Sequence, residues 1–176
     1  MHDPLPLAAS TLFPGPARDA LTAAIAALEL AEQRRQPAEL CQALAQVSRC
    51  YRDVGLQEMA EGYLQQALRW ARALDATDQS VDLLCEAAEL SLLRGSPERA
   101  REQADEAARL ARRTADPAWE LAVLMRASDV LDRLGEHGQA IALHCRALSL
   151  ITQDHLHEPQ TQPAPLAQPA FSTTLM

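Results

Sequence analysis

A chain of 176 residues with a net charge of −8 is long enough for one domain with a sizeable core. Its acidic balance argues against a nucleic-acid-binding protein, which usually presents a basic face. It has neither an apolar stretch long enough to span a bilayer nor a basic N-terminal segment followed by an apolar one. We therefore expect a cytoplasmic protein without a signal peptide or membrane contact.

Seven helices are predicted from apolar periodicity and from the breakers between them, in a composition that is rich in alanine and leucine and only 3% aromatic. Residues 1–14, with several prolines, are predicted to be a flexible segment. The repeat domain is predicted to occupy residues 15–151, and residues 152–176 form a Pro/Gln-rich tail that is predicted to be disordered. The helices are expected at about 16–35, 38–54, 57–74, 79–94, 97–114, 117–134 and 137–151.

A unit of 40 residues recurs through the helical region. Its markers are the glycines Gly15, Gly55, Gly95 and Gly135, with alanines five residues later (Ala20, Ala60, Ala100, Ala140) and twelve residues later (Ala27, Ala67, Ala107, Ala147). Small residues also stand seven positions before the last three glycines, at Ser48, Ala88 and Ser128. A glycine between two helices supplies the left-handed residue that ends the first. In the third unit, Ser96 and Pro97 then provide an N-cap and a first helical position.

The pattern of Ser48, Tyr51, Gly55, Ala60 and Ala67 resembles the tetratricopeptide repeat. The usual unit has about 34 residues, so this chain is more similar to the longer repeats of kinesin light chains and of bacterial regulator sensor regions. The resemblance implies an all-α, right-handed superhelix of three helical hairpins preceded by one additional helix. HEAT-type repeats, which share the longer period, are the alternative, but the small-residue offsets favour the tetratricopeptide type.

No catalytic or cofactor motif is found: the chain has no glycine-rich phosphate loop, no GxSxG and no HExxH. The four cysteines, Cys41, Cys50, Cys85 and Cys145, form no CxxC pair, so free thiols are expected and a metal site is not. His144 and Cys145 are neighbours on a helix and point about 100° apart, so they are not expected to act together. His144 is instead expected to be a polar cap on the last unit. We therefore expect neither an enzyme nor a bound cofactor.

The resemblance implies a concave groove lined by the first helix of each hairpin, which would bind a peptide or helix of another protein. Its candidate residues are Gln42, Arg49, Arg52, Asp82, Glu86, Glu89, Met125, Arg126, Asp129 and Arg133. The groove used by chaperone-binding members to clamp a C-terminal carboxylate needs lysine and asparagine, and this chain has neither. The candidate charges either bind a partner or pair across neighbouring repeats, as Glu89 and Arg126 would.

The predicted function is that of a protein-interaction scaffold. The alternatives are a regulatory, sensor or dimerisation module of a bacterial signalling system, or a secretion-type chaperone. An enzyme is the least favoured interpretation. Near the end of the array, Ile141, Leu148 and Ile151 are expected to stay partly exposed, to be covered by the tail, or to form a homodimer contact. The alanine-rich, lysine-free composition indicates a GC-rich bacterial genome.

Overall fold

The structure is a computed structural model that describes residues 15–157, so the predicted flexible segment and most of the predicted tail lie outside the described residues. Residues 15–157 form seven helices and contain no strand, which confirms the all-α fold class. The helices are α1 (Gly15–Arg34), α2 (Pro37–Asp53), α3 (Gln57–Ala73), α4 (Thr77–Leu93), α5 (Pro97–Ala111), α6 (Pro117–Arg133) and α7 (His137–His157). None of these helices is sufficiently long and apolar to cross a membrane.

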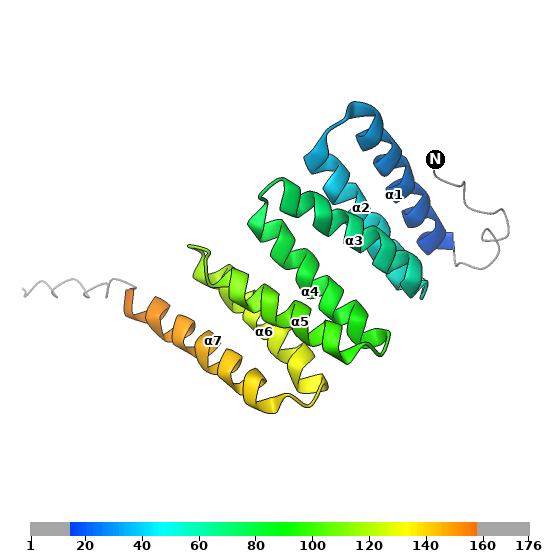
Figure 1. Ribbon diagram of the computed structural model, residues 1–176. Coiled ribbons are helices and arrows are strands. Elements are labelled where there is room, and N and C mark those ends of the chain that lie inside the picture. The colour runs from blue at the N-terminus through cyan, green and yellow to red at the C-terminus, as the bar shows by residue number, and fades with distance from the viewer. Residues whose placement is uncertain (1–14, 158–176) are drawn as a thin grey trace, which may run out of the picture.

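The helices follow one another as an antiparallel stack, with α1 at one end and α7 at the other (Figure 1). Three hairpins, α2–α3, α4–α5 and α6–α7, pack in succession, and α1 packs on α2 ahead of them. The predicted arrangement of three hairpins preceded by one helix is therefore confirmed. Each hairpin contributes one helix, α2, α4 or α6, to a face that contains all the predicted groove residues.

Glycine ends the first helix of every hairpin, as the repeat predicts. Gly55, Gly95 and Gly135 have φ of +79°, +68° and +82°, a backbone conformation that other residues rarely adopt. The amide after each glycine bonds back to the last turn of the helix, as in Leu56 N to Tyr51 O at 2.9 Å. Gly15, before which no helix is predicted, is the first residue of α1.

Two details of the helix ends also differ from the prediction. Ser96 stands at the N-cap of α5, but its side chain makes no capping hydrogen bond. A side-chain cap is found on the next helix, where the carboxylate of Asp116 accepts hydrogen bonds from the amides of Ala118 and Trp119 at the start of α6. Helix α5 ends at Ala111 rather than near residue 114, and α7 runs to His157 rather than to residue 151.

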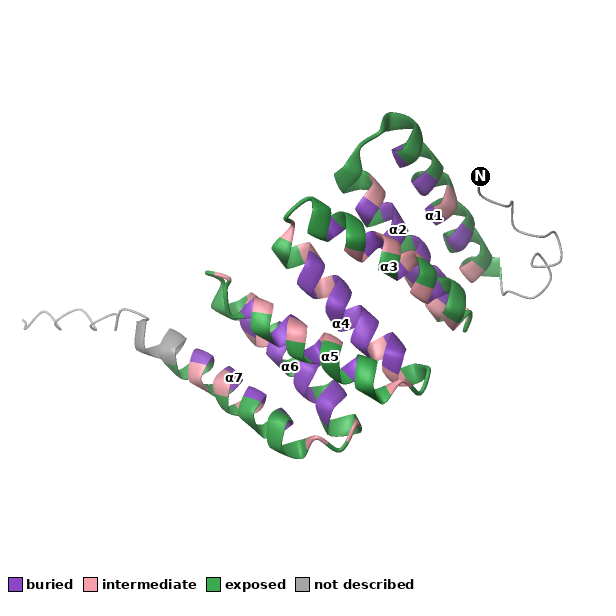
Figure 2. Cartoon of the chain, viewed as in Figure 1, coloured by how far each residue is buried: buried purple, intermediate pink, exposed green. Residues whose placement is uncertain are grey.

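The core is made where small residues let paired helices approach closely. The alanines of the repeat pattern on α3, α5 and α7 are all buried, and so are the small residues opposite them on α2, α4 and α6 (Figure 2). The same alanine positions on α1, Ala20 and Ala27, are exposed. No described helix precedes α1, so its alanine face has no hairpin partner in the described part of the chain.

Candidate functional site: the face of α2, α4 and α6

The predicted groove residues lie on the three helices α2, α4 and α6, and several of them form ion pairs with a residue of a neighbouring helix. Arg49 of α2 forks onto Glu86 of α4, with Nη2 to Oε1 at 2.7 Å and Nε to Oε2 at 3.2 Å. The Glu86 side chain is only 11% exposed, so this carboxylate depends on its arginine for compensation. The contact links the first two hairpins.

Glu89 joins all three helices of this face. Arg126 of α6 donates to Glu89 Oε1 from Nη2 at 2.8 Å and from Nε at 3.1 Å. Arg52 of α2 approaches the other oxygen of Glu89 at 3.9 Å. The predicted pairing of Glu89 with Arg126 is thus confirmed, and the charges of this face hold neighbouring repeats together.

The remaining predicted residues are not brought into this network. Arg133 pairs with Asp129 within α6 at 3.8 Å, while Gln42 and Met125 are exposed to solvent. Asp82 is half-buried, and within the described residues its carboxylate has no hydrogen bond or ion pair. Burial raises the pKa of Asp82, although the nearby guanidinium of Arg126 opposes the shift.

Two cysteines of the helices that form this face, Cys41 on α2 and Cys85 on α4, have buried thiols. Burial raises the pKa of Cys85 to about 11, so its thiol stays protonated at neutral pH. Burial also raises the pKa of Cys41, whose thiol donates to the backbone carbonyl of Ala67 at 3.2 Å. Cys50 is buried as well, and Cys145 is the exposed cysteine of the four. All four are free, as predicted, and the described residues contain no group of three potential metal ligands.

Sequence reasoning missed Gln46 and the pair formed by Glu120 and Arg146. Gln46 lies one turn before Arg49 on α2 and accepts from its Nη1 at 3.5 Å, a helical neighbour that the spacing could have indicated. Glu120 is buried on α6 and receives Arg146 of α7, with Nε to Oε1 at 3.0 Å. No repeat signal points to this pair, because the equivalent positions of the preceding hairpin, Ser80 and Glu106, carry no matching charges.

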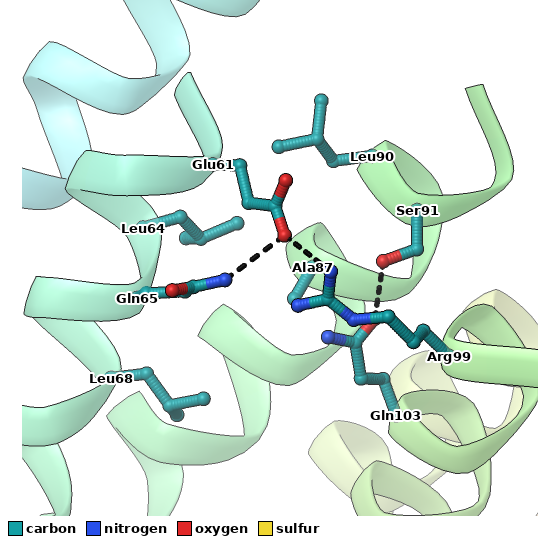
Figure 3. A pocket seen from close by; sticks show the side chains of 9 residues that line it. All are labelled: Glu61, Leu64, Gln65, Leu68, Ala87, Leu90, Ser91, Arg99 and Gln103. Atoms are coloured by element: carbon teal, nitrogen blue, oxygen red, sulfur yellow. Dashed lines mark hydrogen bonds and ion pairs between the residues drawn. The ribbon is translucent and has the colours of Figure 1, made fainter. Parts of the chain in front are cut away.

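The opposite side of the stack contains a crevice between α3, α4 and α5 (Figure 3). Glu61 binds Arg99 at 2.6 Å and accepts from Gln65 at 2.9 Å, and Arg94 also pairs with Glu61. Ser91 donates to Gln103 at 2.8 Å on the other wall. The enclosed space is about 20 Å³, which holds roughly one water molecule. This crevice is therefore a packed junction rather than a ligand site.

His144 has a different role from the predicted polar cap. Its Nε2 lies 3.0 Å from the hydroxyl of Ser128, so the imidazole is tied to α6 within its own hairpin. The position holds Leu64 and Ala104 in the earlier repeats, where both are buried. His144 replaces an apolar contact with a hydrogen bond between α6 and α7.

The repeated hairpins define an all-α helical-repeat protein. Among solved structures, BtubC (BKLC) from P. vanneervenii matches with a TM-score of 0.71 and 18% identity, over 92% of this chain and 64% of BtubC. At this identity the likeness shows the fold alone, and the chain spans 64% of the length of BtubC.

Two further structures match more loosely. The DHF58 filament has a TM-score of 0.46 and 22% identity, over 78% of this chain and 83% of that chain. The MamA protein has a TM-score of 0.35 and 12% identity, over 82% of this chain and 99% of that chain. Both TM-scores are below 0.5. No protein-family model and no curated protein matches the chain.

Proposed function

We propose that this chain is a protein-interaction scaffold that binds a helix or an extended segment of another protein across the face of α2, α4 and α6. The observation that carries the proposal is the bridge from Arg52 through Glu89 to Arg126, which spans all three helices. A face held in fixed register by such contacts is pre-organised, so a ligand loses less binding free energy to ordering it.

The contacts on this face also indicate which side chains are available to bind the ligand. Arg49 and Arg126 are neutralised by Glu86 and Glu89, so they offer little free charge to a partner. The exposed groups on these helices include the thioether of Met125 and polar side chains such as Gln42, besides the paired Asp129 and Arg133. Methionine adapts its shape to apolar ligands. We expect a partner segment with an apolar anchor, bound with weak dependence on salt.

The test compares two methionines that are equally exposed. Met125 on the proposed face and Met59 on α3 are each 46% exposed, so Met125→Arg and Met59→Arg add the same charge at matched accessibility. Partners are captured from bacterial lysate with each variant and with the wild type, and the affinity of any captured protein is then measured by calorimetry. Circular dichroism confirms that each variant is folded.

We expect the Met125→Arg variant to lose at least tenfold in affinity for a partner that the Met59→Arg variant keeps. Neither Glu86 nor Glu89 is changed in this design, because removing either would disturb the packing of neighbouring repeats as well as the face. Equal affinity of the two variants for every partner would exclude this face as the binding surface.

A dimerising regulatory module is the second candidate function. It is favoured by the exposed apolar residues of α7, Ile141, Leu148 and Ile151. No contact in the described residues favours the secretion-chaperone alternative over these two.

A further inference from the structure

The outer stripe of α7 is the most exposed apolar surface on any described helix. Ile141, Leu148 and Ile151 are 60%, 61% and 39% exposed. Their spacing of seven and three residues places all three side chains on one side of the helix. Exposed apolar stripes of this kind on a soluble protein mark contacts with other molecules.

The same stripe is buried at the other end of the array. The residues of α1 at the same repeat positions are Leu21, Leu28 and Ala31, which are 3%, 1% and 2% exposed where α1 packs on α2. The repeat therefore places an apolar stripe where a neighbouring helix packs, and on α1 that neighbour is α2. On α7, no described helix packs on the stripe.

The internal repeats show which structural element packs on the equivalent stripe. On α5 the positions that correspond to Leu148 and Ile151 are Ala108 and Ala111, which are buried in clusters that contain Leu124 and Val123 of α6, while Arg101 at the position of Ile141 is exposed. In the same way α4 packs on α3. Each cover is a helix that runs antiparallel to the one beneath it (Figure 1). The α7 stripe is accordingly shaped for an antiparallel helix.

The electrostatics of α7 favour a second copy of itself as that helix. Between residues 138 and 152 the only Asp, Glu, Lys or Arg is Arg146, and its guanidinium binds the buried Glu120. His144 is tied to Ser128. A twofold contact brings the same surface against itself, so any unpaired charge would meet a like charge. The α7 stripe has no such charge, whereas α5 carries charged residues along most of its length.

We propose that two copies of this chain associate through α7 in an antiparallel, isologous contact. Ile141 of one copy then lies opposite Ile151 of the other, and Leu148 and Cys145 lie near the twofold axis. The assembly carries two faces of α2, α4 and α6 on one particle. A partner with two binding segments would then gain from effective concentration as well as from single-site affinity.

The oligomeric state of the full chain tests this contact. Light scattering after gel filtration is expected to give the mass of a dimer for the wild type and of a monomer for Leu148→Glu. The matched control is Leu30→Glu on α1, since Leu30 is also an exposed leucine, at 44%. We expect that control to remain dimeric, and circular dichroism to show unchanged helix content in both variants.

Cross-linking provides a second readout that does not depend on folding of the glutamate variant. Cys145 is exposed, whereas the other three cysteines are buried, so mild oxidation of the dimer should yield a disulfide-linked pair that Cys145→Ser abolishes. A dimer that survives Leu148→Glu would place the contact elsewhere and overturn the proposal.

A wild-type chain that stays monomeric at all concentrations would also overturn it. Rapid maleimide labelling of Cys145 would then mean that the stripe is free for a different partner, and slow labelling that residues 158–176 cover it. Leu148→Glu leaves Met125 untouched, so failure of the dimer and failure of the proposed partner-binding face give distinguishable results.

Discussion

Replacing Ala100 by leucine tests the close packing on which the repeat depends. Ala100 is 0% exposed and belongs to the same cluster as Ala88 of the paired helix α4. Three added carbon atoms have no space there without separating the two helices. Overpacking of this kind costs about 1–3 kcal/mol, and helix propensity changes little between alanine and leucine.

The control is Glu102→Leu, which places the same side chain at an exposed position of the same helix. Surface substitutions usually change stability by about 0.5 kcal/mol or less. For a domain of this size, 1 kcal/mol corresponds to a shift in Tm of about 2–4 °C, so Ala100→Leu should lower Tm by roughly 2–12 °C. Gln103 is a poorer control position, because its side chain accepts a hydrogen bond from Ser91.

Urea unfolding followed by circular dichroism gives both free energies of unfolding. Ala60→Leu and Ala140→Leu should behave like Ala100→Leu, since all three alanines are fully buried at the same repeat position. Equal destabilisation by Ala100→Leu and Glu102→Leu would show that the repeat register proposed for α5 is wrong.

Three other predictions concern an ion pair, the turns and the half-buried carboxylate of Asp82. Arg49→Ala should destabilise the fold by about 1–3 kcal/mol in urea unfolding, because it leaves the nearly buried carboxylate of Glu86 unpaired, and adding Glu86→Ala should recover part of the loss. Gly55→Ala should cost about 1 kcal/mol because φ is +79° there, whereas Gly62→Ala, within α3 and with open space around the new Cβ, should stabilise by about 0.5–1 kcal/mol; similar effects at both sites would contradict the assigned turn geometry. Burial raises the pKa of Asp82 above its value in the unfolded chain, so protonation favours the folded state and that stability is lost as pH rises through the folded-state pKa. Asp82→Asn should therefore raise Tm at pH 7 and leave it nearly unchanged at pH 3, and a lower Tm at pH 7 would refute the assignment.

The sequence was sufficient to predict the helices and their turns because those features are local. Glycine between two helices, prolines and small residues at fixed offsets each act within a few residues of their own position. Most helix ends were accordingly placed within one or two residues. The ends of α5 and α7 are the exceptions. Helix α5 ends at Ala111, three residues before the expected position. The polar residues after Ile151 indicate a tail, but no proline follows until Pro159, so nothing local ends α7 there.

Apart from the pairing of Glu89 with Arg126, the partner of each charged residue could not be predicted in the same way, because it depends on contacts between repeats. Arg49 and Glu86 are 37 positions apart, and Glu89 and Arg126 are also 37 apart. Arg52 and Glu89 have the same separation. Adjacent first helices therefore meet one helical turn short of the 40-residue period, a relation that is visible only once the helices are packed.

This separation gives a rule for recognising which residues of the face are left for a ligand. A charge that finds the opposite charge 37 positions away is used in holding the repeats together. Met125 instead has Ala88 at that distance, and Gln42 has Gln79, so neither has an ionic counterpart in the adjacent repeat. Both residues are also exposed. The same repeat geometry that commits Arg49, Glu86, Glu89 and Arg126 to the fold thus leaves Met125 and Gln42 accessible, which is why the proposed binding experiment changes a methionine rather than a charge.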